Sequence, residues 1–131
     1  MTTESDKKQT ILAVDDTPEN LDVVKSILVS EYTVKAAVNG KMALKIAETQ
    51  LPDLILLDIM MPEMDGYEVC RRLKVNPVTQ KIPVIFLTAK GGGEALAEGF
   101  ESGAIMYINK PFTANKLLTI VNTMLEPPAA P

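Results

Sequence analysis

The sequence predicts a single α/β domain in which a parallel sheet is covered by helices on both faces. Short apolar runs without polar alternation recur along the chain, as in strands that are buried on both sides. A stretch with helical spacing of apolar residues follows each run, and this alternation implies right-handed crossovers between parallel strands. The length of 131 residues suits one domain, and a hydrophobic fraction of 47% is enough for a core.

The first two strand–helix units occupy the N-terminal part of the chain. Residues 11–14 form the first apolar run, which predicts a strand. A helix is predicted from Thr17-Pro18, because threonine is a good N-cap and proline suits the first helical position. The β-branched segment 32–38 predicts the second strand, and Asn39-Gly40 turns the chain into the second helix.

The remaining three units follow the same pattern. Their predicted strands are residues 54–57, 84–87 and 105–108. Helices are predicted to begin after Asp65 and Thr113, which are suitable N-caps, and a further helix is predicted over about 94–101. The residues that the helices are expected to bury are Leu21, Val24, Leu28, Ala43, Leu44, Ala47, Val69, Cys70, Leu73, Leu117, Leu118, Val121, Met124 and Leu125.

We divide the chain into a disordered N-terminal segment (1–9), the folded domain (10–125) and a Pro/Ala-rich tail or linker (126–131). The polar N-terminus does not resemble a signal peptide, and no apolar run is long enough to span a bilayer. We therefore predict a cytoplasmic protein that makes no contact with a membrane.

Composition excludes several classes of function. A net charge of −4 argues against direct nucleic-acid binding, which needs a basic surface. The single cysteine, Cys70, cannot form an internal disulfide and is best interpreted as a small buried residue. The absence of histidine excludes His-based catalytic triads, His-ligated zinc and an internal phosphohistidine. Any phosphoryl group must therefore arrive from a histidine outside these residues.

Polar residues follow four of the predicted strands, at the sheet edge where such folds bind ligands. They are Asp15 and Asp16 after the first strand, Asp58 after the third, Thr88 after the fourth and Lys110 after the fifth. Three adjacent carboxylates repel one another unless a cation lies among them, and Mg²⁺ prefers such oxygen ligands. We therefore predict a Mg²⁺ site at which Asp58 is the nucleophile, while Lys110 and the hydroxyl of Thr88 contact a transferred phosphoryl group.

Each of these residues also has an ordinary structural interpretation. Asp15-Asp16 alone is better explained as a solvated turn, and Thr88 alone as a residue that satisfies the backbone at a strand end. Lys110 alone is compatible with a surface ion pair that contributes about 0–1 kcal/mol. The prediction depends on all of them occurring together at the correct strand ends.

Four segments, in order, resemble the receiver domains of bacterial response regulators over about residues 10–125. They are ILAVDD (11–16), LLDIMMPEMDG (56–66), LTA (87–89) and YINKPF (107–112). The resemblance implies the flavodoxin-like (βα)5 fold with strand order 2-1-3-4-5. It also implies a cis peptide bond between Lys110 and Pro111, which is common only before proline.

The resemblance also implies a role for each site residue. Asp15, Asp16, Asp58 and the backbone carbonyl of Met60 would hold Mg²⁺, for which Mn²⁺ is able to substitute. Asp58 would be phosphorylated, and its acyl phosphate would be slowly hydrolysed, without conventional turnover of an external substrate. Lys110, Thr88 and Ala89 would bind the phosphoryl group. Thr88 and Tyr107 would form the switch pair that alters the output face of the fourth helix, fifth strand and fifth helix.

The implied partners are proteins of two-component signalling. A sensor histidine kinase or a histidine phosphotransfer protein would donate the phosphoryl group, and a downstream effector or a fused output domain would receive the signal. Phosphorylation-dependent homodimerisation is compatible with the resemblance.

Two segments depart from the receiver pattern. Gly91-Gly92-Gly93 replaces the usual polar residues, and glycine costs about 1 kcal/mol per helix-interior position. A simple flexible loop and a regulatory role are equally good interpretations of this triplet. Met106 stands where an acid often precedes the switch aromatic, and it is expected to be an exposed methionine without consequence, although an apolar edge would favour self-association.

The sequence fits three other classes of protein less well. A haloacid-dehalogenase-like phosphatase would show an Asp-x-Asp pattern, whereas Asp15 and Asp16 are adjacent. A flavodoxin-like FMN binder would need a hydroxyl- and glycine-rich loop after the first strand, where this chain has acids. A degenerate receiver that serves only for docking would lack site residues that are all present here.

Overall fold

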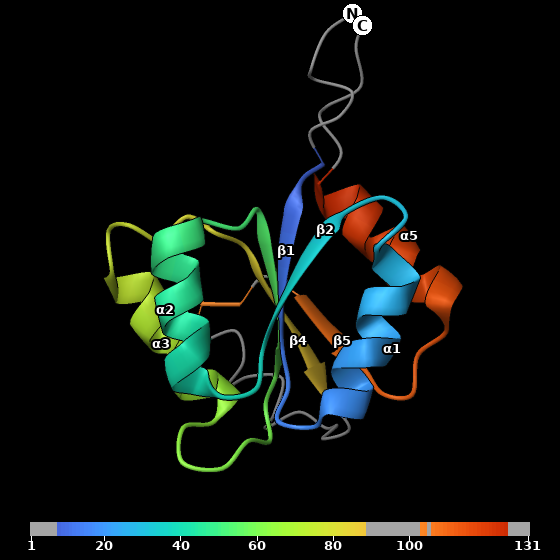
Figure 1. The fold of residues 1–131 in the computed structure, drawn as a ribbon. Coiled ribbons are helices and arrows are strands. Elements are labelled where there is room, and N and C mark those ends of the chain that lie inside the picture. The colour runs from blue at the N-terminus through green and yellow to red at the C-terminus, as the bar shows by residue number, and fades with distance from the viewer. Residues whose placement is uncertain (1–7, 89–102, 105, 126–131) are drawn as a thin grey trace, which may run out of the picture.

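Five parallel strands form one sheet in the order β2-β1-β3-β4-β5, which confirms the predicted fold and strand order (Figure 1). The computed structural model describes residues 8–88, 103–104 and 106–125. The strands are β1 (Thr10–Val14), β2 (Thr33–Ala37), β3 (Leu54–Asp58), β4 (Val84–Thr88) and β5 (Met106–Asn109). The helices of the described residues are α1 (Pro18–Leu28), α2 (Gly40–Gln50), α3 (Gly66–Val75) and α5 (Ala114–Leu125).

The sheet separates two apolar cores. Helices α2 and α3 lie against one face, and α1 and α5 lie against the other (Figure 1). Strand β3 contributes to both, because Ile55 and Leu57 pack on the α2/α3 side while Leu54 and Leu56 pack on the α1/α5 side. All four side chains are fully buried. This double burial explains why the sequence of β3 shows no polar alternation.

Two of the three predicted N-cap residues make a capping hydrogen bond through their side chains. The side chains of Asp65 and Thr113 accept hydrogen bonds from the N–H groups of Glu68 (2.9 Å) and Lys116 (3.0 Å), which fixes the starts of α3 and α5. Thr17 occupies the N-cap position of α1, but its side chain makes no capping bond. Proline at the first helical position lacks an N–H group, so α1 has one fewer donor to satisfy there.

The fifth strand corrects one expectation. Met106 was expected to be exposed, but it is partly buried and packs on the α1/α5 side together with Ile108. Because side chains alternate along a strand, Met106 and Ile108 share a face, and Tyr107 turns to the opposite core. The apolar residue at position 106 therefore contributes to packing between the sheet and the helices.

The structure also addresses the predictions for Cys70 and for the peptide bond between Lys110 and Pro111. Cys70 is fully buried, and the Lys110–Pro111 bond is cis, as predicted. The helix predicted over 94–101 and the triplet Gly91-Gly92-Gly93 lie outside the described residues. Within the described ranges, no helix has the length and apolar character needed to cross a bilayer.

Candidate metal centre

Strand register brings the candidate acids to one edge of the sheet. Strands β1 and β3 are neighbours, and Val14 lies opposite Leu57, so that Asp15 and Asp58 follow at the same level. Asp15, Asp16 and Asp58 each offer a carboxylate oxygen, and these oxygens lie within 4.8 Å of one another. Asp15 and Asp58 are buried, while Asp16 is exposed. Three carboxylates at this spacing suit a hard divalent cation with oxygen ligands, such as Mg²⁺.

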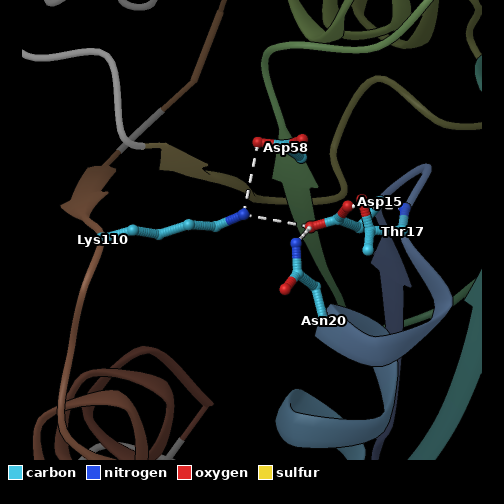
Figure 2. Close-up of polar contacts among 5 residues, drawn as sticks. All are labelled: Asp15, Thr17, Asn20, Asp58 and Lys110. Carbon is cyan, nitrogen blue, oxygen red and sulfur yellow. Dashed lines mark hydrogen bonds and ion pairs between the residues drawn. The ribbon is translucent and has the colours of Figure 1, made fainter.

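Lys110 supplies a positive charge to the same centre. Its side chain extends from the loop between β5 and α5, and Nζ lies 3.0 Å from Asp15 Oδ2 and 3.5 Å from Asp58 Oδ1 (Figure 2). The ammonium group thereby bridges the two buried acids. One ammonium compensates only part of the charge of three carboxylates, so the centre retains attraction for a further cation.

Asp15 is held by hydrogen bonds on both oxygens (Figure 2). Its Oδ1 accepts a hydrogen bond of 2.9 Å from the backbone N–H of Thr17. Thr17 therefore contributes to the site through its backbone, although its side chain makes no capping bond. Its Oδ2 accepts bonds from Lys110 Nζ (3.0 Å) and from Asn20 Nδ2 (3.2 Å). Asn20 was not among the predicted site residues. The only sequence signal for it is its position in the first turn of α1, five residues after Asp15.

The surroundings of Asp58 disfavour its charged form. Burial raises the pKa of the Asp58 carboxyl above its ordinary value, the nearby Lys110 ammonium lowers it, and the charges of Asp15 and Asp16 raise it further. The net shift is upward because desolvation outweighs the attraction of a single lysine. A divalent cation among these acids would offset that repulsion.

The backbone beside Asp58 is held by a close approach of Gly66. The Gly66 N–H donates a hydrogen bond of 2.9 Å to the carbonyl of Ile59. A Cβ atom at position 66 would lie 2.4 Å from the carbonyl oxygen of Asp58 and 2.9 Å from the Cα of Ile59. Only glycine therefore allows the start of α3 to pack directly on the end of β3.

We expect Gly66→Ala to destabilise the protein by about 1–3 kcal/mol, because the added methyl group forces the backbone at Asp58 to move. The free energy of unfolding in urea, monitored by circular dichroism, measures this loss.

Gly40→Ala is the matched control, since Gly40 also begins a helix directly after its N-cap. A Cβ at position 40 would meet Val69 Cγ2 at 2.7 Å and Met64 Sδ at 2.9 Å, which are side-chain atoms rather than the backbone atoms that crowd position 66. A Gly40→Ala variant that loses as much stability as Gly66→Ala would contradict the special role of the Asp58 backbone.

The other predicted site residues are placed in part. Thr88 is the last residue of β4, where it pairs with Asn109, but its side chain and the whole of Ala89 lie outside the described residues. Met60 follows Asp58 by two positions in the loop before α3, and its side chain is exposed. Tyr107 is partly buried on the α2/α3 side, and burial raises the pKa of its hydroxyl group.

The sheet order and the acid cluster together define a flavodoxin-like α/β protein with a candidate divalent-metal site at the carboxyl edge of its strands. Comparison with known families makes the assignment specific, because the response regulator receiver domain matches residues 11–122. The chain belongs to this family. Its members are phosphorylation-activated signalling switches, and Mg²⁺-dependent phosphorylation of an aspartate is their general mechanism.

Individual relatives agree with this assignment. A probable cyclic di-GMP phosphodiesterase of Vibrio cholerae is 49% identical over 117 residues, covering 89% of this chain and 26% of the relative. Response regulator PleD of Caulobacter vibrioides is 44% identical over 115 residues, covering 87% of this chain and 25% of the relative. The chain thus spans about a quarter of the length of these relatives.

A solved structure gives the same result for the fold. The chemotaxis protein CheY4 of Vibrio cholerae superimposes with a TM-score of 0.86 at 30% identity, covering 91% of this chain and 100% of that one. Receiver domains use Mg²⁺ at their acidic pocket and interact with histidine kinases and output domains. The acid cluster of this chain has the donor chemistry that such an ion requires.

Proposed function

We propose that Asp58 accepts a phosphoryl group from a phosphohistidine of a sensor histidine kinase or a histidine phosphotransfer protein. The main support is the position of Asp58: it is a buried acid at a strand end, 3.5 Å from Lys110 Nζ and grouped with two further carboxylates. The 131 residues of the chain contain no histidine, so the phosphohistidine donor lies outside this domain. We place this reaction in the cytoplasm.

The transfer forms one bond and breaks another. A carboxylate oxygen of Asp58 attacks phosphorus, the P–N bond to the donor imidazole breaks, and the imidazole nitrogen keeps the bonding electron pair and takes up a proton. The product on Asp58 is an acyl phosphate. Later attack by water on phosphorus releases inorganic phosphate and restores the carboxylate.

Other side chains of the centre stabilise the charge on the phosphoryl group. Asp15, Asp16, Asp58 and the backbone carbonyl of Met60 would hold Mg²⁺, with Mn²⁺ as a substitute. The ion, when bound, neutralises negative charge on the phosphoryl oxygens. Lys110 is near enough to Asp58 to move its ammonium group from Asp15 onto a phosphoryl oxygen.

The signal would leave the domain at the edge of the sheet that β5 forms. We propose that Thr88 and Ala89 contact the phosphoryl group and that Thr88 and Tyr107 form the switch pair, which changes the surface around β5 and α5. Residues 10–125 would form the receiver and 126–131 a tail or linker. The greater length of the curated relatives supports an effector or fused output domain as the recipient of the signal. Alternatively, phosphorylation would cause two copies of the chain to form a homodimer.

Intact-mass spectrometry tests the central claim. The protein is incubated with acetyl phosphate or phosphoramidate and Mg²⁺, and we expect a gain of one phosphoryl group. Because the acids need a cation, a chelator should prevent this gain. Uptake that persists in the chelator, or no uptake from either donor, would contradict the proposal.

A further inference from the structure

We propose that Asn20 is a positioning residue for Mg²⁺ binding, which it serves by fixing the orientation of the Asp15 carboxylate. This inference rests on the proposed function, since it concerns the metal that the centre would hold. Its basis is the hydrogen bond of 3.2 Å from Asn20 Nδ2 to Asp15 Oδ2 (Figure 2). Asn20 does not need to contact the metal or the phosphoryl group for this role.

A count of lone pairs shows what the contact does. A carboxylate offers about four acceptor positions, two on each oxygen. Among the residues that the structure describes, Lys110 and Asn20 both donate to Asp15 Oδ2, while only the N–H of Thr17 donates to Oδ1. One acceptor position therefore remains, and it lies on Oδ1. The asparagine and the lysine together leave that oxygen as the one available to a metal or to a metal-bound water.

The two donors on Oδ2 differ in how firmly they are held. Lys110 is shared between Asp15 and Asp58, and in the proposed reaction its ammonium group moves to the phosphoryl group. Asn20 has a short side chain on α1, and its own backbone N–H is bonded to the carbonyl of Thr17 at 3.0 Å. Leu21, the next residue, is buried in the core and anchors this turn. Asn20 thus keeps Asp15 in place when Lys110 leaves.

The alternative interpretation is that Asn20, an exposed residue in a first helical turn, makes a local hydrogen bond that has no effect on metal binding. The structure favours the positioning role because the acceptor is a buried acid of the metal centre. The bond also falls on the oxygen that Lys110 uses, rather than on a backbone group of the helix.

Calorimetric titration of the full chain with Mg²⁺ tests the inference directly. We expect Asn20→Ala to raise the Kd for Mg²⁺ about tenfold, as is typical when a residue that orients a metal ligand is removed. Ser26→Ala is the matched control: Ser26 is an exposed polar residue of the same helix, and its hydroxyl donates to the carbonyl of Val23 at 2.8 Å. Alanine favours helix at both positions, so both variants should fold.

Phosphorylation kinetics give a second readout that a merely structural role would not produce. With acetyl phosphate as donor, the Mg²⁺ concentration for half-maximal rate should rise about tenfold in Asn20→Ala, in step with the Kd. The maximal rate at saturating Mg²⁺ should stay close to that of the unaltered protein, because the residues that contact the phosphoryl group are unchanged.

The outcomes separate this inference from the proposed function. An Asn20→Ala variant with an unchanged Kd overturns the positioning role while the unaltered protein still binds Mg²⁺ and gains a phosphoryl group. A lower maximal rate with an unchanged Kd also overturns it. An unaltered protein that neither binds Mg²⁺ nor is phosphorylated overturns both.

Discussion

Asp58→Asn is expected to abolish phosphoryl uptake while leaving the fold intact. The amide has the shape of the carboxylate but lacks its nucleophilic oxygen, so no acyl phosphate can form. Intact-mass spectrometry after incubation with acetyl phosphate and Mg²⁺ should show only the unmodified mass. A phosphoryl group found on the variant would mean that another residue is the acceptor. Asp53→Asn, which changes an acid outside the metal centre, should retain full uptake.

Asp58→Asn should also stabilise the metal-free protein at neutral pH. The pKa of Asp58 is raised in the folded state above the ordinary value of 3.8, so the folded chain releases this proton less readily than the unfolded chain does. The resulting loss of folded-state stability begins as pH rises past the ordinary value and is complete above the raised pKa. Asparagine does not ionise and avoids this loss.

Chemical denaturation across pH measures the effect. In the presence of a chelator, Asp58→Asn should unfold at a higher urea concentration than the unaltered protein at pH 7, and the gap should narrow as pH falls through the range in which Asp58 gains its proton. Asp22→Asn, at an exposed acid of α1, is the control and should change little. A gap that stays constant with pH would show that ionisation of Asp58 is not its cause.

Lys110→Met is expected to slow phosphorylation about 100- to 1,000-fold, because the transferred group loses its cationic partner. The same variant should bind Mg²⁺ more tightly, since the ammonium group now lies 3.0 Å from Asp15 Oδ2 and 3.5 Å from Asp58 Oδ1 and repels the ion. Mass-spectrometric time courses and calorimetry measure the two quantities. Methionine has a similar length without the charge, so the comparison isolates the ammonium group.

The decisive result for Lys110→Met is that the phosphorylation rate falls while the affinity for Mg²⁺ rises. If the rate and the Mg²⁺ affinity both fell, Lys110 would be holding the centre together rather than acting on the phosphoryl group. Lys116→Met provides the control, because Lys116 is exposed on α5 and contributes its backbone N–H to the helix cap. Neither quantity should change in that variant.

The fold was predictable because its signals are local. Strands β1 and β3 are apolar runs that the helices bury on both faces, and each is followed by a helical pattern with its own start signal. The acids and Lys110 were predictable for a related reason, since parallel strands end at a common edge and residues at those ends must converge.

The features that sequence reasoning missed depend on tertiary contacts. Asn20 looks like any polar residue in a first helical turn until the side chain of Asp15 is placed beside it. Thr17 has the residue type of a cap, yet its N–H donor to Asp15 is the contact that matters. The exposure of Met106 was predicted wrongly because the face that a β5 residue presents depends on strand register, which a four-residue strand sequence does not reveal.

The long sequence separations within the centre have a practical meaning for the cell. The bond between Lys110 and Asp15 joins residues 95 positions apart, and Asp58 comes from a strand between them. An incompletely folded chain therefore contains all the site residues but does not bring their side chains together. If Asp58 is the phosphoryl acceptor as proposed, such a chain is not phosphorylated, and errors in folding lower the amount of phosphorylated protein.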